Sequence, residues 1–97
     1  MGATSPNAQI EASLLELKRE LTGLGVRSTV VRDREGWACL DAYDRFARRL
    51  RVHLFVQSFL FVWGDEFYDR HSMFDPAEAA VRLACLALGP GWPERPR

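Results

Sequence analysis

The sequence has little cysteine, and it lacks the short motifs that commonly mark an enzyme. Only two cysteines occur among 97 residues, Cys39 and Cys85, and they are too far apart for a C-x-x-C redox or metal motif. We interpret both as small buried hydrophobic residues. Neither a glycine-rich phosphate loop nor a nucleophile elbow is present. We therefore predict a protein that is not an enzyme and needs no cofactor.

Net charge is also missing, because 13 acidic residues balance 13 basic ones. This balance argues against generic binding to the phosphates of nucleic acids. Basic residues do cluster locally, at Arg45, Arg48, Arg49 and Arg51. A nucleic-acid contact could use such a cluster, with Phe46 stacking on a base. We favour a solvated loop in which Asp41 and Asp44 balance these charges.

Long apolar runs are absent as well. The longest covers 12 residues, 52–63, and includes His53 and Gln57, so it is too short and too polar to cross a bilayer. The chain does not open with the pattern of a signal peptide, and we expect a cytoplasmic protein with no membrane partner. Twelve of the thirteen basic residues are Arg, a bias typical of GC-rich bacterial genomes. We therefore expect a bacterial source.

Two segments have the signals of helices. The first begins at Ser5-Pro6, ends at Gly23 and Gly25, and has one apolar stripe. The stripe consists of Ile10, Leu14, Leu17, Leu21 and Leu24. It has too few heptads for a coiled coil, so we expect it to pack on a sheet.

The second helix begins at Asp75, where Pro76 and Glu78 complete a variant of the capping box, and it stops at Gly89-Pro90. Its predicted apolar stripe consists of Ala77, Ala80, Val81, Ala84, Cys85 and Leu88. We expect both helices to cover the same face of a sheet, because each has only one apolar stripe.

Between the helices, alternating apolar and β-branched residues predict four strands, at 26–33, 37–42, 50–56 and 59–63. We interpret 34–36 as a turn and 43–48 as a polar connection. A helix over 41–50 is the competing interpretation, because Tyr43, Phe46, Ala47 and Leu50 also fit a helical period.

The run 52–63 predicts a tight hairpin that turns at Gln57-Ser58. In this register three cross-strand pairs point into the core, namely Val56 with Phe59, Leu54 with Phe61, and Val52 with Trp63. The alternate residues Phe55, Leu60 and Val62 then point to the other face, beside Arg51 and His53.

Together these elements predict an α+β fold in the order α-β-β-β-β-α. Its four-stranded antiparallel meander has the N-terminal and C-terminal helices on one face. We expect a single domain over 1–97, with flexible ends at 1–5 and 90–97. Residues 64–74 are expected to form a long connection.

The second face of the sheet is the best indication of function, because an exposed apolar surface usually marks an interface. We predict a non-enzymatic protein-interaction domain, a homodimeric adaptor or regulator. Its interface would use Phe55, Leu60, Val62 and Trp37, with Arg51 and His53 setting orientation. Another protein is the alternative partner. The alternative structure has residues 64–74 or the Trp92 tail folded over this face.

Two other functions stay open. One is a ligand-binding domain with a pocket between Trp63, Phe67, Tyr68 and His71. The other is a metal-dependent enzyme that uses Asp65, Glu66, Asp69 and His71. These residues lack the spacing of known metal motifs, so we predict no metal and interpret them as a solvated loop.

Residues 50–88 resemble small uncharacterised actinobacterial proteins that join a short antiparallel sheet to a final Ala-rich helix. The matching segments are Phe-Val-Trp-Gly at 61–64 and Asp-Pro-Ala-Glu-Ala-Ala at 75–80. The helix–sheet–helix order is also similar to that of secretion-chaperone-like domains. That similarity implies binding to other proteins and dimerisation, and it transfers no catalytic residue.

Overall fold

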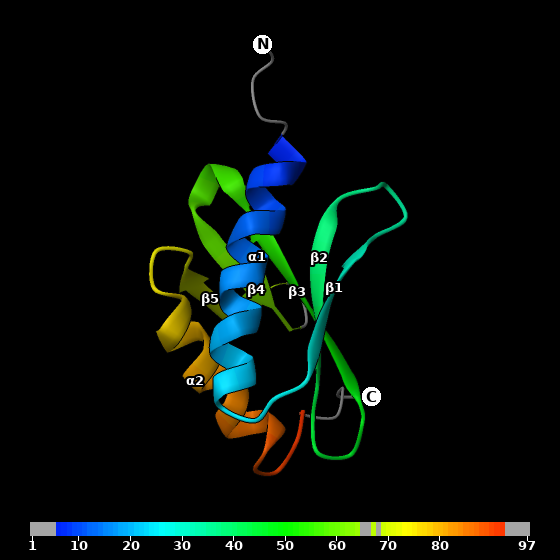
Figure 1. The fold of residues 1–97 in the computed structure, drawn as a ribbon, viewed down its shortest axis with the longest axis vertical. Coiled ribbons are helices and arrows are strands. Elements are labelled where there is room, and N and C mark those ends of the chain that lie inside the picture. Colours follow the sequence, from blue (N-terminus) through cyan, green and yellow to red (C-terminus); the bar gives the residue numbers. More distant parts are fainter. Residues whose placement is uncertain (1–5, 65–66, 68, 93–97) are drawn as a thin grey trace.

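The sheet and the two helices form two layers, with both helices on the same face of the sheet (Figure 1). The computed structural model describes residues 6–64, 67 and 69–92. The elements are α1 (Pro6–Gly23), β1 (Ser28–Arg32), β2 (Ala38–Tyr43), β3 (Arg49–Phe55), the short η1 (Val56–Ser58), β4 (Leu60–Trp63), β5 (Asp69–Ser72) and α2 (Pro76–Ala87). The strands pair in the order β1-β2-β3-β4-β5, each antiparallel to its neighbour. The predicted α+β plan is confirmed, but the sheet has five strands where four were predicted.

The β3–β4 hairpin has the predicted register. Leu54 pairs with Phe61, and Phe55 with Leu60. The predicted two-residue turn is wrong, because Val56–Ser58 form one short helical turn and Phe59, which caps it, adopts a left-handed conformation with φ 56°. Phe59 is consequently exposed and does not belong to the core. Of the other five inward residues, Val52, Leu54, Phe61 and Trp63 are buried as predicted, and Val56 is half-buried against the core.

The additional strand, β5, lies in the segment that was predicted to be a connection. Its sequence, Asp-Arg-His-Ser, has no apolar alternation, because an edge strand needs only one paired neighbour and can expose polar side chains. It pairs with β4, so that His71 lies opposite Phe61. The His71 ring stacks on Trp63 with 4.7 Å between ring centroids.

The connection between β2 and β3 is a loop, and the competing helix over 41–50 is wrong. Asp44 organises the loop, because its Oδ1 accepts hydrogen bonds from the backbone N–H groups of Phe46 and Arg48 at 2.9 and 2.8 Å. Ala47 closes the loop in a left-handed conformation, with φ 62°.

The first helix presents its predicted stripe to the core, since Ile10, Leu14, Leu17 and Leu21 are all buried. Leu24 lies just beyond the helix and is exposed. The α2 cap is also confirmed, because Oδ1 of Asp75 accepts a hydrogen bond from the Glu78 N–H at 3.1 Å.

The predicted apolar stripe of α2 is wrong in four of its six members. The helix buries Ala79, Ala80, Leu83, Ala84 and Ala87. Ala77, Val81 and Cys85 of the helix and Leu88 at its C-cap are exposed, and we call these four residues the outer stripe. Small alanine side chains let α2 lie close to α1, and this packing decides which of two apolar stripes turns inward. Cys85 is therefore exposed, whereas Cys39 is buried as predicted.

Trp92 is not part of a free tail. Its side chain is 6% exposed and belongs to the core. Its backbone N–H donates to Oδ2 of Asp44 at 3.1 Å, and its Nε1 donates to the carbonyl oxygen of Arg48 at 2.8 Å. Residues 90–92 thus return to the β2–β3 loop, while residues 1–5 and 93–97, also predicted to be flexible, lie outside the described residues. Over the described part of the chain, neither helix combines the length and apolarity needed to cross a membrane.

Candidate functional site

The sheet has one face that the helices do not cover, which we call the open face. Pairing places Leu40, Val52 and Phe61 towards the helices. Because successive side chains alternate between faces, their neighbours in the strands point to the open face. By this alternation, all six residues predicted to form an interface point to the open face. They are Trp37, Arg51, His53, Phe55, Leu60 and Val62.

Aromatic side chains gather at one end of the open face. We define the aromatic patch as Trp37, Phe55, Leu60 and Phe67. Trp37 is 46% exposed, Phe55 41% and Phe67 37%. The Phe67 ring lies edge-on to Phe55 and to His53, with ring centroids 5.1 and 5.3 Å apart.

Phe67 belongs to the predicted connection 64–74. The segment 64–74 therefore does fold back over the open face at Phe67, as the alternative prediction had it. Val62 is fully buried and cannot itself contact a partner, so it supports the aromatic patch from within. The remaining aromatic area is still exposed to solvent.

The other end of the open face is charged, and its charges compensate one another. Asp41 is only 3% exposed, and the Arg51 opposite it on β3 binds both of its carboxylate oxygens, at 2.8 and 3.0 Å. Arg49 lies 3.7 Å from the same carboxylate. Hydrogen bonding to Asp41 raises the pKa of Arg51. This paired geometry makes the Asp41–Arg51 end a rigid polar border to the aromatic patch.

The predicted balance of the arginine cluster is also confirmed. Arg48 binds Oδ2 of Asp44 through its Nε at 2.9 Å. The guanidinium groups of Arg45 and Arg48 lie 4.7 and 5.4 Å from the centre of the Phe46 ring. The arginine side chains of this cluster thus already contact the carboxylates of Asp41 and Asp44 and the Phe46 ring of the same loop.

Cys39 and His53 lie opposite each other on neighbouring strands of the open face, and burial favours the neutral form of each. Burial raises the pKa of the Cys39 thiol, which lowers its nucleophilicity. Burial, and next the Arg51 guanidinium, lower the pKa of His53. Both pKa shifts thus have desolvation as their main cause.

The residues of the predicted ligand pocket do not come together. Trp63 and His71 stack on the helix-covered face, whereas Phe67 lies on the open face. Tyr68 is outside the described residues, as are Asp65 and Glu66 of the predicted acidic cluster. Within the described ranges, no three His, Cys, Asp or Glu side chains are placed to hold a metal ion.

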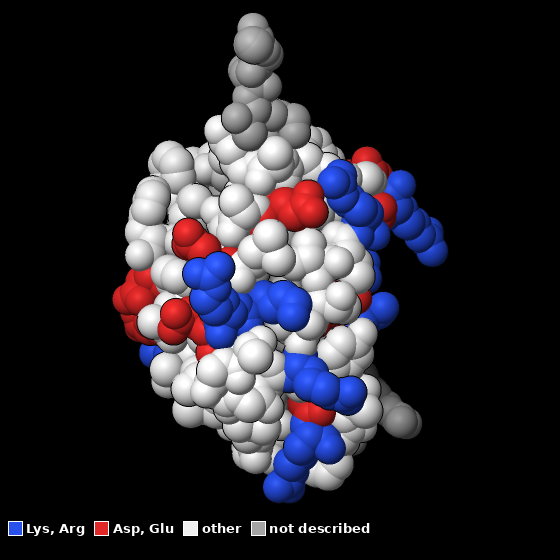
Figure 2. Space-filling model, viewed as in Figure 1, with Lys and Arg blue, Asp and Glu red and all other residues white. Residues whose placement is uncertain are grey.

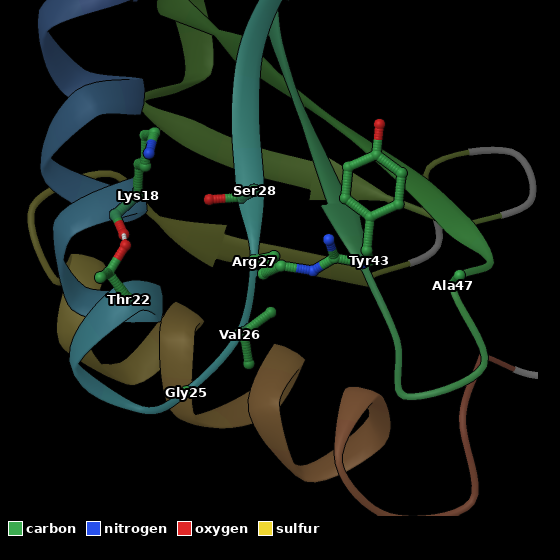
Figure 3. A pocket seen from close by; sticks show the side chains of 8 residues that line it. All are labelled: Lys18, Thr22, Gly25, Val26, Arg27, Ser28, Tyr43 and Ala47. Atoms are coloured by element: carbon green, nitrogen blue, oxygen red, sulfur yellow. Dashed lines mark hydrogen bonds between the residues drawn. The ribbon is translucent and has the colours of Figure 1, made fainter.

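A cavity that the sequence did not indicate lies between α1 and the edge strand β1. It has a volume of about 670 Å³ and is lined by Lys18, Thr22, Gly25, Val26, Arg27, Ser28, Tyr43 and Ala47. Figure 2 shows basic side chains near the middle of the view, at its upper right and at its lower right, with acidic groups on the left and also among the basic ones. Figure 3 shows the cavity from close by. Its lining comes from three separate segments, so only the tertiary fold could reveal it.

Compared with protein-family models, with curated proteins and with solved structures, the chain has no significant match. The predicted resemblances to actinobacterial proteins and secretion-chaperone-like domains therefore stay predictions.

Proposed function

We propose that this chain is a non-enzymatic interaction domain that forms a homodimer through the open face and acts as an adaptor or regulator. The observation that carries the proposal is the aromatic patch. It exposes Trp37, Phe55 and Phe67 on a sheet face that no helix covers. Aromatic residues are enriched in interface centres, where their large apolar surface gains most from leaving water.

A two-fold axis parallel to β3 makes the aromatic patch complementary to itself. Strand order runs from β1 to β5, so this axis sets β2 of one copy over β4 of the other. Trp37, just before β2, then meets Leu60 of the second copy, while Phe55 on the central strand meets its own counterpart. Two sheets packed in this way interdigitate side chains at the usual separation of about 10 Å.

Charge supports the same pairing. Asp33 lies at the β1 side of the aromatic patch, and Arg70 lies on β5 at the opposite side. Neither residue takes part in an ion pair among the described residues. The two-fold axis brings Asp33 of one copy near Arg70 of the other, twice. The net charge of zero also means that two copies do not repel each other at long range.

Light scattering during size-exclusion chromatography tests the proposal with Leu60→Glu. The wild-type protein should elute as a dimer at micromolar concentration, and the variant as a folded monomer, because the new carboxylate would be buried without a partner. Circular dichroism checks that the variant is folded.

Val81→Glu is the matched control, because it places the same charge on the outer stripe of α2, on the helix side of the molecule. It should leave the dimer intact. Three outcomes would refute the proposal. These are a wild-type monomer, a Leu60→Glu variant that stays dimeric, and a Val81→Glu variant that becomes monomeric, which would move the interface to α2.

A further inference from the structure

The cavity between α1 and β1 is separate from the aromatic patch. It adjoins the charged end of the open face, where Tyr43 ends β2, whereas the aromatic patch lies at the other end of the same strands. Its volume of about 670 Å³ falls within the usual range for small-molecule sites. Failure of the dimer proposal would leave this cavity unchanged.

Two cationic side chains line the cavity, Lys18 from α1 and Arg27 from just before β1. None of the ion pairs formed among the described residues includes either of them. This differs from the arginines of the β2–β3 loop and β3, of which Arg48, Arg49 and Arg51 are each paired with a carboxylate. The cavity therefore has positive charge that the described part of the chain does not neutralise.

The hydroxyl group of Ser28 adds a polar group that needs a partner. Its Oγ is buried and makes no hydrogen bond. In Figure 3 this hydroxyl points from β1 towards α1, on the side where Lys18 lies. An orphaned buried hydroxyl costs stability unless a ligand or water satisfies it.

The backbone of the edge strand β1 supplies a further hydrogen-bond donor. Arg27 is in a hydrogen-bonded pair, since its carbonyl oxygen accepts from the Tyr43 N–H at 3.0 Å. In an antiparallel ladder the next residue, Ser28, directs its own N–H away from β2. The cavity thus combines a hydroxyl, an edge-strand N–H and a lysine ammonium, which are the donors that bind oxyanions.

The rest of the lining suits an apolar or aromatic body. Val26 is buried at the cavity. The Arg27 guanidinium lies 5.9 Å from the centre of the Tyr43 ring and beside it in Figure 3. An arginine and a tyrosine arranged in this way offer flat surfaces to a planar group.

We propose that this cavity binds a small organic anion. Its carboxylate or phosphate group lies between Lys18 and Ser28 on the helix side of β1. Its apolar or ring portion passes Val26 and the edge of β1 towards the Arg27–Tyr43 pair, which lines the cavity from the other face. Phosphate and carboxylate share the chemistry that these donors recognise, so the experiment must separate the two.

Titrations of phenyl phosphate, benzoate and inorganic phosphate, followed by heteronuclear NMR at low ionic strength, test the site. We expect phenyl phosphate or benzoate to bind saturably with a Kd below about 1 mM, with shifts at Ser28 and Val26. The tighter of the two identifies the anionic group. Inorganic phosphate should bind more weakly, because it lacks the ring. Lys18→Gln should weaken binding about tenfold or more, since a charge-assisted hydrogen bond is lost.

Arg19→Gln is the matched control, because it removes a neighbouring positive charge of α1 that does not line the cavity. It should change the Kd less than about twofold. The proposal is overturned if no probe saturates, if inorganic phosphate binds as tightly as phenyl phosphate, or if Arg19→Gln weakens binding as much as Lys18→Gln.

A second measurement uses the fact that Lys18 is the only lysine in the sequence. Its acylation by an amine-reactive ester can be followed by mass spectrometry, with the α-amino group as internal reference. Saturating phenyl phosphate or benzoate, whichever binds more tightly, should slow acylation at Lys18 alone. Equal rates with and without the bound probe would also overturn the proposal.

Discussion

The backbone N–H of Trp92 donates a hydrogen bond to Oδ2 of Asp44 across 48 residues of sequence, at 3.1 Å. The same carboxylate accepts the Nε–H of Arg48 and the backbone N–H groups of Phe46 and Arg48. One buried side chain thus organises the β2–β3 loop and fastens a distant segment to it. Burial acts to raise the pKa of Asp44, but the hydrogen bonds from Arg48, Trp92 and Phe46 outweigh it and lower the pKa.

Acid should therefore weaken the fold through Asp44. A carboxyl group whose folded pKa lies below its unfolded value stabilises the protein above the unfolded pKa, near 3.8, and loses this effect as pH falls. Asp44→Asn should lower the thermal midpoint at neutral pH and flatten its decline between about pH 5 and about pH 3. Circular dichroism melts across this range measure both effects, and an unchanged slope would contradict this role.

The indole of Trp92 should be a main source of stability. Trp92→Ala should cost about 3–5 kcal/mol, because it removes a buried ring and leaves a cavity. Trp37→Ala is the matched comparison, since Trp37 is exposed on the aromatic patch. It should change the free energy of unfolding of the monomer little and weaken dimerisation instead. Chemical denaturation and light scattering separate the two effects, and similar losses of stability for both variants would refute this assignment.

Asn7 should stabilise the β1–β2 turn from α1. Its Nδ2 donates to the carbonyl oxygen of Gly36, and its Oδ1 accepts from the Ala38 N–H, each at 2.8 Å. Asn7→Ala should cost about 1–3 kcal/mol, since two hydrogen bonds are lost. The exposed neighbour Gln9 is the control, and Gln9→Ala should be close to neutral. Equal urea midpoints for the two variants would show that Asn7 does not hold this turn.

His53 should make stability depend on pH in the range where histidine titrates. Its pKa is lowered in the folded protein, so the unfolded chain binds more protons and stability rises with pH. Stability should therefore fall as pH drops below about 6.5. His53→Gln should remove part of this dependence, seen as a smaller difference between the unfolding midpoints at about pH 7.5 and about pH 5.5. An equal difference in the variant would assign the effect to other groups.

The sequence predicts the β3–β4 hairpin well because its pattern is local. Aromatic and β-branched residues alternate on both sides of one polar pair, and this fixes which residues face each other. The turn itself was less predictable. Phe59 takes a left-handed conformation that a bulky residue adopts only when its surroundings require it.

The features that the sequence did not predict depend on distant neighbours. The strand β5 has four polar residues and becomes a strand only because β4 offers an unpaired edge. In α2 nearly every side of the helix has apolar residues, so periodicity alone cannot distinguish the inner stripe from the outer one. The close approach of α1 selects the alanines. Similarly, Lys18 and Ser28 share a cavity only because α1 packs beside β1.

The attachments of Asn7 and Trp92 have a consequence for biosynthesis. Asn7 binds the start of β2 at Ala38. Trp92 binds the loop that follows β2, at Asp44 and Arg48. The strand in the middle of the chain is thus fastened by residues from opposite ends of the described sequence. During translation β2 and β3 leave the ribosome long before Trp92 does. The domain therefore completes its core in a late step, after residue 92 has emerged, and a nascent chain that stalls earlier exposes the apolar surface that Trp92 covers.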